Sequence, residues 1–573
     1  MRLINIEAFL EREETMSKGL RVNRRCKVLE FRDDKTTAYV ILSHRWIEGT
    51  EVDYEEMAGL ARMDVEERDE IRQRRGYKKI WDTCQLAKGD GYGWVWMDTC
   101  CIDNRSSAEL SEAINSMYRW YENSRVCYAY LHDLPDPSIP TRSNVSRYPN
   151  SNGWPEWFSR GWTLQEMIGP RDVQFFNMYW NPIGDKAGLA ETLEGITCVP
   201  KHILARGLAG NRPCVAQIMS WAANRTTTRI EDRAYSLMGL LDVNMPMLYG
   251  EGQKAFHRLQ LEIIRTSDDQ SIFAWGGSNE WTGNILADDP SFFEPCSQME
   301  LMDHAEFIKS LKKYFPHEEL PPIEEDRFGT FPITNRGIHI WMLLDRCCNT
   351  DSIFRGVLPC RLYPQAPPVS VVLALWNSNY YKYYFPVGVP TERKLQFRQI
   401  YLRYQETFPS VTFEIDDSAV VESGFTCRDV YPSNFQGNTL TVAGTNPLCA
   451  RVYSNGQRDC DFAVTFGQCF DQGWVHTIKY PGNLLQFYKE ESLQRPERAQ
   501  RMAEVPSRHN RYGRIWVNHI RLSGWIVRTS RLVWGRSIIG VRIEAFLDPC
   551  INIGLNEWRT LDVQVGSSLI VYT

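Results

Sequence analysis

The chain has 573 residues, of which 43% are hydrophobic and 24% are charged, so it is a globular protein with room for about three or four domains. Its formal net charge is -6, which provides no general attraction for nucleic acid or for an anionic membrane surface. No stretch approaches the roughly 20 uninterrupted apolar residues of a membrane span, and the start of the chain lacks the features of a secretory signal. We therefore expect a cytoplasmic protein with reduced cysteines, no membrane span and no nucleic-acid partner.

Short apolar runs predict four β-strands in the first third of the chain, at residues 38–42, 94–97, 125–131 and 173–176. Apolar residues at helical spacing predict helices at residues 76–89, 108–122 and 156–168, and Ser106 and Ser107 are candidate N-caps of the second helix. Strands that alternate with helices indicate a parallel sheet with right-handed crossovers. The predicted fold class is therefore α/β over residues 38–186, preceded by an N-terminal segment of residues 1–37.

The remainder of the chain changes character twice. Amphipathic segments predict a helical region over residues 187–275, and residues 276–330 have the composition of a linker with a short helix. Residues 331–573 are rich in short β segments and predict a sandwich-like domain. The segments are residues 369–375, 411–415, 460–466, 537–546 and 569–572. The dense charges at residues 229–233 indicate a structural network of ion pairs.

Polar side chains follow three of the predicted strands, at residues 43–46, 98–103 and 132–133. Because ligands bind beyond the carboxyl ends of strands in parallel sheets, we expect a site at this edge. Adjacent Ser43 and His44 have poor geometry for a Ser-His-Asp triad, and no Gly-x-Ser-x-Gly elbow accompanies them.

A tryptophan and an acid occupy the third predicted helix. Glu166 lies four residues after Trp162, and on a helix this spacing places both side chains on one face, about one turn apart. Such a pair could hold a flat ring beside a carboxylate. The structural alternatives are core packing for Trp162 and a partnership between Glu166 and Arg160.

Several motifs resemble those of the fungal heterokaryon incompatibility (HET) domain. They are Ile-Leu-Ser-His-Arg-Trp at residues 41–46, Asp-Thr-Cys-Cys-Ile-Asp at residues 98–103, residues 107–117, and Arg-Gly-Trp-Thr-Leu-Gln-Glu at residues 160–166. Residues 229–237 and 248–252 resemble the region that follows this domain, so the resemblance covers residues 38–275. The chain departs from the family pattern at Arg45, Asn104 and Met167. The resemblance implies a role in programmed cell death after recognition of non-self.

The HET domain is in turn similar to the TIR fold, which implies a flavodoxin-like parallel sheet. Residues 39–43 resemble the first TIR strand, and residues 101–103 with the following loop resemble the second strand and the BB loop. Residues 162–166 are similar to the TIR pattern Trp-Cys-x-x-Glu, with Thr163 in place of the cysteine. In enzymatic TIR domains this glutamate is catalytic in cleaving nicotinamide from NAD. The resemblance therefore implies that Glu166 is the catalytic residue.

The chemistry of this reaction suits a single buried carboxylate. Breaking the nicotinamide–ribose bond spreads positive charge over the ribose, which Glu166 could stabilise. The side chains that could bind the rings, ribose or phosphates of NAD are Ser43, His44, Arg45, Trp46, Asp98, Asp103, Glu112 and Trp162. A structural role is the alternative for His44, turn stabilisation for Asp98 and Asp103, and a solvated or capping role for Glu112. NAD is expected as a substrate, with no separate cofactor and no metal.

Two functions stay open from the sequence. In the first, the chain hydrolyses NAD when it self-associates through the HET domain, because TIR-type sites are often completed by a neighbouring protomer. In the second, it is a non-enzymatic adaptor that binds partners, such as an upstream death-signalling protein, through exposed loops like residues 104–107. The first requires Glu166 to lie within a side-chain length of residues 43–46.

Overall fold

The chain forms two compact units, Met1–Thr407 and Phe408–Thr573, in a computed structural model. The structure describes residues 1–18, 27–208, 210, 212–276, 283–316, 320–329, 331–348, 350–383, 391–404, 411–422, 424–431, 437–442, 449–455, 460–469, 472–479, 522–533 and 536–547.

A mixed sheet organises the first part of the first unit, with strand order β2-β1-β4-β3-β5-β6-β7. Its strands are β1 (Arg2–Asn5), β2 (Leu29–Phe31), β3 (Val40–His44), β4 (Trp94–Trp96), β5 (Val126–Tyr130), β6 (Val173–Phe176) and β7 (Pro182–Asp185). Strands β4, β3, β5 and β6 are parallel, whereas β1, β2 and β7 join antiparallel at the two ends. The four predicted strands are confirmed, and the N-terminal segment adds two strands to the same sheet.

The order of the parallel strands indicates where on this sheet a ligand is expected to bind. The first of them, β3, lies between the second, β4, and the third, β5. Doubly wound sheets with this flavodoxin-like order bind ligands where the first and third strands meet, at their carboxyl ends. The α/β class with a parallel sheet is thus confirmed, while the more specific TIR-like assignment stays a prediction.

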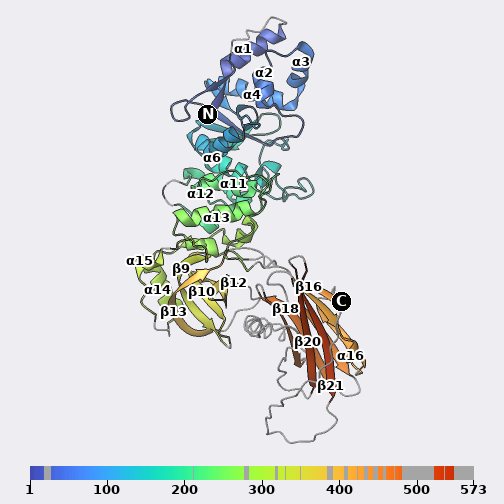
Figure 1. Ribbon diagram of the computed structural model, residues 1–573. Coiled ribbons are helices and arrows are strands. Elements are labelled where there is room, and N and C mark those ends of the chain that lie inside the picture. Colours follow the sequence, from blue (N-terminus) through green and yellow to red (C-terminus); the bar gives the residue numbers. More distant parts are fainter. Residues whose placement is uncertain are drawn as a thin grey trace. The chain divides into compact units, whose positions relative to one another are not determined.

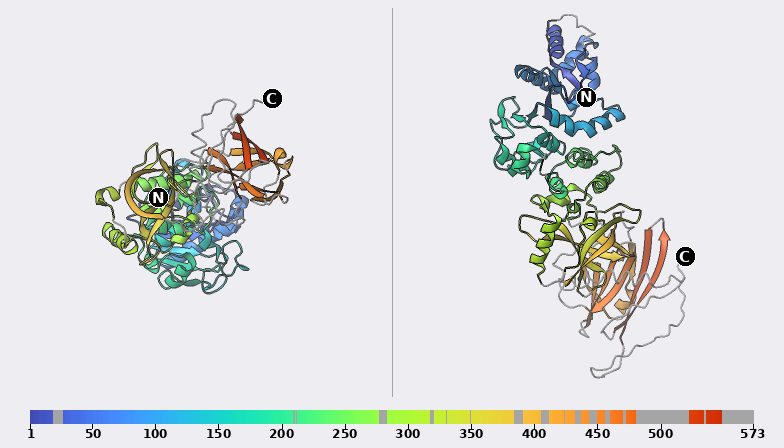
Figure 2. Two further views of the ribbon diagram at one scale, coloured as in Figure 1. Left: turned by 90° about the horizontal axis from the view of Figure 1, so that it is seen from below. Right: turned by 90° about the vertical axis from the view of Figure 1, so that its left-hand side faces the viewer.

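Helices connect these strands and are coloured blue to cyan in Figures 1 and 2. They are α1 (Ile6–Ser17), α2 (Tyr54–Gly59), α3 (Val65–Gln73), α4 (Arg75–Gly89), α5 (Asp98–Cys101) and α6 (Ser107–Asn123). The predicted helices at residues 76–89 and 108–122 correspond to α4 and α6. Ser106 is confirmed as the N-cap of α6, because its side chain accepts a hydrogen bond from the Glu109 backbone N–H.

The third predicted helix, residues 156–168, is wrong as a continuous element. It is a 3-10 turn, η1 (Glu156–Ser159), followed after a break by the short helix α7 (Thr163–Ile168). The break has a tertiary cause. Gly161 N–H donates to the Thr226 carbonyl at 2.8 Å, and Thr226 N–H donates to the Ser159 carbonyl at 2.6 Å. These long-range hydrogen bonds take backbone groups that a continuous helix would use.

The rest of the first unit is helical and then β-rich. Its helices are α8 (Ala190–Thr197), α9 (Lys201–Arg206), α10 (Val215–Trp221), α11 (Asp232–Tyr235), α12 (Met238–Leu241), α13 (Lys254–Thr266), η2 (Gln270–Phe273), η3 (Pro290–Cys296), α14 (His304–Tyr314) and α15 (Glu325–Phe328). The helical prediction for residues 187–275 agrees with these elements. The predicted linker contains η3, α14 and α15, together with β8 (Glu300–Leu301).

Five strands then close into a ring, because β11 pairs with both β12 and β10 (Figure 1). They are β9 (Ile338–Cys347), β10 (Ile353–Arg361), β11 (Pro368–Trp376), β12 (Asn379–Lys382) and β13 (Thr391–Leu402). One hydrophobic core runs from Leu3 in β1 to Leu402 in β13. The predicted β-rich domain is therefore divided, since its first part, through Thr407, belongs to the first unit.

The described residues of the second unit form two four-stranded sheets, ordered β16-β14-β21-β20 and β15-β17-β18-β19. Its elements are β14 (Val411–Asp416), α16 (Ser418–Glu422), β15 (Thr426–Tyr431), β16 (Thr439–Val442), β17 (Cys449–Asn455), β18 (Cys460–Cys469), β19 (Gln472–Lys479), β20 (Leu522–Val533) and β21 (Arg536–Leu547). Side chains from both sheets, such as Phe413 and Phe466, share one core, as in a sandwich. The predicted strand at residues 569–572 lies outside the described residues.

Among the residues that the structure describes, no helix combines the length and the apolar composition needed to cross a lipid bilayer.

Candidate functional site

A buried serine and a buried glutamate meet where β3 ends. Ser43 lies in β3 and Glu166 in α7, and they are 0% and 4% exposed. The Trp157 indole donates a hydrogen bond to Ser43 Oγ at 2.7 Å, and the Ser43 hydroxyl donates to the Glu166 carboxylate. Because an indole N–H can only donate, it fills an acceptor site on Ser43 and leaves the hydroxyl proton for Glu166. The expectation that Glu166 reaches the segment 43–46 is confirmed.

The surroundings of Glu166 disfavour its charged form. Burial raises the pKa of Glu166 to about 8, and the nearby carboxylate of Asp98 adds to this effect. The Ser43 hydroxyl, Arg160 and Tyr121 oppose it without cancelling it. A carboxyl group whose pKa is raised in this way is typical of functional sites.

His44 sits between two further carboxylates. Its Nε2 lies 3.7 Å from Glu51 Oε2 and 3.9 Å from Asp98 Oδ1. Lys79 Nζ pairs with Glu51 Oε1 at 2.6 Å, and Trp46 Nε1 donates to Asp98 Oδ2 at 2.8 Å. Burial would raise the pKa of Glu51, but His44 and Lys79 outweigh it and lower the pKa to about 2. Glu51 is therefore a stable anion beside the imidazole.

A second group of charges gathers where β3 and β5 end. Arg45 Nη1 pairs with Glu156 Oε2 at 2.8 Å, and the same oxygen lies 3.5 Å from His132 Nε2. Asp133 Oδ2 accepts a hydrogen bond from the Glu156 backbone N–H at 2.9 Å. Burial lowers the pKa of His132, although Asp133 and Glu156 oppose this shift.

We refer to these side chains together as the strand-end cluster: Ser43, His44, Arg45, Trp46, Glu51, Lys79, Asp98, His132, Asp133, Glu156, Trp157 and Glu166. The structure thus brings together Glu166 and five of the eight predicted substrate-binding residues. Their position matches the edge of the sheet that the strand order marks for ligands. Sequence reasoning did not select Glu51, Lys79, Glu156 or Trp157, because these residues stand at no recognisable spacing from the motifs they join.

Trp162 does not belong to the strand-end cluster. Burial raises the pKa of Asp232, and hydrogen bonds from Tyr249 and the Trp162 indole oppose that shift. Trp162 thus points toward the helical region rather than toward Glu166. Trp162 is the N-cap of α7 with helical backbone angles, and the Glu166 N–H lies 3.5 Å from its carbonyl, so the predicted one-turn spacing holds. The indole nevertheless serves Asp232 and not a site beside the acid. The tryptophan that reaches the site is Trp157.

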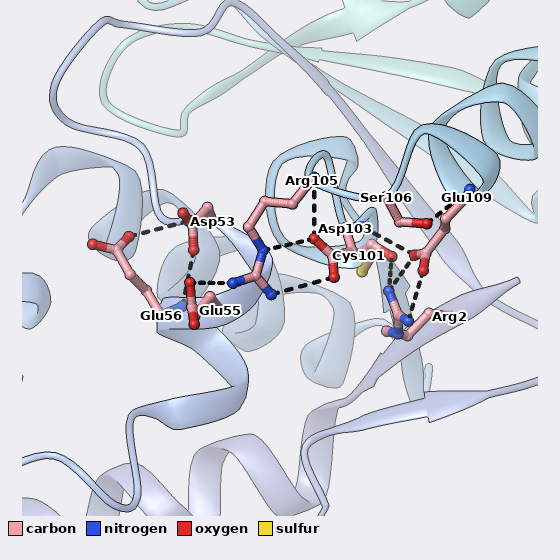
Figure 3. A network of polar contacts seen from close by, with 9 residues as sticks. All are labelled: Arg2, Asp53, Glu55, Glu56, Cys101, Asp103, Arg105, Ser106 and Glu109. Carbon is pink, nitrogen blue, oxygen red and sulfur yellow. Dashed lines mark hydrogen bonds and ion pairs between the residues drawn. The ribbon is translucent and has the colours of Figure 1, made fainter.

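Asp103 and Glu112 also lie apart from the cluster. Asp103 pairs with Arg105 at 3.0 Å, and its backbone N–H donates to Glu109, which binds Arg2 (Figure 3). Arg105 lowers the pKa of Asp103 through these hydrogen bonds. Glu112 is exposed on α6. The structural alternative of turn and loop stabilisation describes Asp103 better than a place in the substrate site.

A buried arginine from the helical region holds the backbone that leads into α7. Arg225 Nη1 donates to the Arg160 carbonyl at 2.8 Å and to Thr163 Oγ1 at 3.0 Å. Burial lowers the pKa of Arg225 to about 10, and the charge of Glu166 opposes this shift. The backbone of Arg225 is held in turn by Arg233, which pairs with Asp289 at 2.5 Å. This ion pair agrees with the structural network expected at residues 229–233.

Replacing Arg225 with methionine is expected to destabilise the first unit by about 3 kcal/mol, because Thr163 and the Arg160 carbonyl lose a buried charged donor. Urea unfolding followed by tryptophan fluorescence measures the change. Arg229→Met is the control, since Arg229 is exposed and its guanidinium stacks on Tyr249 at 4.3 Å. Equal stability of the two variants would contradict a clamping role for Arg225.

Gly76 in α4 sets the position of the Glu51 segment. Its N–H donates to the Thr50 carbonyl at 3.1 Å, and an added Cβ would lie 2.4 Å from that oxygen and 2.7 Å from Glu51 Cα. Alanine at position 76 is therefore expected to destabilise the protein by roughly 1–3 kcal/mol. Gly89→Ala, in the same helix, meets nothing within 4 Å and is expected to be neutral or stabilising in the same urea titration. Similar losses in both variants would argue against the close approach at Gly76.

The fold and the cluster define a mixed α/β domain with a buried carboxylate at the carboxyl ends of its parallel strands. Residues 39–155 match the heterokaryon incompatibility protein (HET) family, and residues 254–284 match a domain of unknown function (DUF8212). The chain therefore belongs to the proteins that carry a HET domain, as its motifs predict.

One curated relative extends the match beyond the family domain. Over 235 residues the chain is 40% identical to the vegetative incompatibility protein HET-E-1 of Podospora anserina. The aligned part covers 40% of this chain and 16% of that protein, so the chain spans about one sixth of its relative's length. No solved structure matches the chain.

Proposed function

We propose that the chain acts in heterokaryon incompatibility, as an effector of cell death that hydrolyses NAD to nicotinamide and ADP-ribose. The family match and the likeness to a vegetative incompatibility protein support the cellular role. The observation that carries the enzymatic role is the buried Glu166, which is hydrogen-bonded to Ser43 at the switch point of a parallel sheet. The motif likeness to TIR domains supplies the reaction.

The strand-end cluster has the groups that this reaction needs. The nicotinamide ring of NAD is cationic, and the ribose becomes cationic as the ring leaves, so both favour the ionised form of Glu166. The Ser43 hydroxyl orients this carboxylate. Arg45 is 37% exposed and could exchange Glu156 for a phosphate of the substrate, because its guanidinium fits either anion.

Self-association through the HET domain and activation by an upstream death-signalling protein are part of the proposal. The full chain is incubated with NAD over a roughly 100-fold range of protein concentration. Released nicotinamide is measured by chromatography. The expected result is release that rises more steeply than in proportion to protein concentration. A folded, self-associated chain that releases no nicotinamide would overturn the enzymatic proposal.

The second candidate function is a non-enzymatic death-signalling adaptor. It is favoured by one observation: Asn104 and Arg105 on the loop before α6, and Ser107 at the start of α6, are exposed, although Arg105 is partly engaged by Asp103 and Glu55 (Figure 3). An adaptor predicts cell death that survives Glu166→Gln and is lost on Arg105→Ala. An NAD-hydrolysing effector predicts the reverse.

A further inference from the structure

His44 carries two ring nitrogen atoms, and both are buried. The residue is 4% exposed, yet among the described residues neither Nδ1 nor Nε2 has a hydrogen-bond partner. An imidazole buried in this way ordinarily has at least one partner. Asp98 Oδ1 is likewise buried and without a hydrogen-bond partner in the described part of the chain.

Each of the two carboxylates beside His44 has one oxygen atom that is bound by another side chain. Lys79 occupies one oxygen of Glu51, and Trp46 occupies one oxygen of Asp98. The two remaining oxygens face His44 Nε2 at 3.7 and 3.9 Å, which is too long for direct hydrogen bonds. The separation of 3.9 Å between Nε2 and Asp98 Oδ1 is one that a single bridging water can span, with about 2.8 Å to each atom.

We propose that His44 and Asp98 hold and activate the water molecule that attacks the ribose. This inference rests on the proposed hydrolysis of NAD and assigns its second step, whereas Glu166 serves the first. His44 directly follows Ser43, the hydrogen-bond partner of Glu166, at the carboxyl end of β3, and Asp98 beside His44 also raises the pKa of Glu166. Glu166 therefore stabilises the cationic ribose while His44 supplies its nucleophile.

The step is balanced in atoms and charge. The bond between C1′ and the nicotinamide nitrogen breaks, and its electron pair leaves with nicotinamide, which departs neutral. The water oxygen forms the new bond to C1′ and gives one proton to Nε2 of His44. Glu51 and Asp98 stabilise the resulting imidazolium, which then releases the proton to solvent. The products are nicotinamide, ADP-ribose and one proton.

The competition between water and nicotinamide tests this role. The full chain is incubated with NAD and deuterated nicotinamide, and mass spectrometry measures labelled NAD and ADP-ribose. Returning nicotinamide needs no base because it brings no proton to remove, whereas water does. His44→Gln is therefore expected to raise the ratio of exchange to hydrolysis by roughly 10², the usual contribution of a general base. Asp98→Asn, which keeps an acceptor for Trp46, is expected to shift the ratio in the same direction.

His257→Gln is the matched control, because it removes a histidine paired with Asp288 at 2.7 Å outside the strand-end cluster. Circular dichroism verifies that each variant is folded. An unchanged ratio in folded His44→Gln would overturn the inference, and so would equal loss of both products. Absence of any cleavage by the wild-type chain is a different result, since it overturns the proposed function and the inference with it.

Discussion

Glutamine at position 166 is expected to slow nicotinamide release by a factor on the order of 10²–10³, because it removes the charge that stabilises the cationic ribose. Glutamine keeps the shape of the side chain and an oxygen that can accept from Ser43. The loss is therefore expected in the rate of bond cleavage rather than in folding. Single-turnover release of nicotinamide at saturating NAD measures it directly.

The matched control for this change is Glu13→Gln. Glu13 is also 4% exposed, but it binds Tyr77 and Arg72 away from the strand-end cluster. It is expected to leave nicotinamide release unchanged. Equal rates for wild type and Glu166→Gln would retain an enzyme but remove Glu166 from its mechanism.

The same substitution is expected to stabilise the protein at alkaline pH. The pKa of Glu166 rises from 4.5 to about 8 on folding, so the native state binds the proton more tightly than the unfolded chain. Its contribution to stability is complete below pH 4.5 and is lost as the pH rises through about 8. The shift corresponds to a loss on the order of 5 kcal/mol across this window.

Urea unfolding of wild type and Glu166→Gln between pH 4 and pH 9 measures this effect. The free energy of unfolding of the wild type is expected to fall relative to the variant as the pH rises, because only the wild type must bury an ionising group. Other titrating residues are common to both chains and cancel in the difference. Parallel pH profiles would show that Glu166 titrates normally in the folded chain.

The parallel sheet could be predicted because its strands are short apolar runs bounded by turns, a pattern that burial alone dictates. The edge that carries the site followed from strand polarity, which placed Ser43, His44 and Asp98 together. The break before α7 could not be predicted, since it depends on backbone hydrogen bonds to Thr226, some 65 residues later.

The residues that contact the predicted site residues could not be predicted either. Glu51 and Lys79 become neighbours of His44 only because Gly76 lets α4 approach the Thr50 backbone closely. Nothing in the charge pattern around these residues distinguishes them from solvated surface groups. The sequence therefore predicts the central residues of the strand-end cluster. The charged residues around them, such as Glu51 and Lys79, are brought there by tertiary packing.

The pairing of Thr226 with Ser159 and Gly161 bears on how such a domain can move between genes. Residues 39–155 alone would lack Glu166, and a segment ending at residue 186 would carry the acid without Arg225 or Thr226. Neither piece would retain the contacts that set the turn before α7. The smallest segment that can be exchanged as a functional domain is therefore expected to extend at least to Asp289, which pairs with Arg233. A shorter segment would carry the sheet without the contacts that position Glu166.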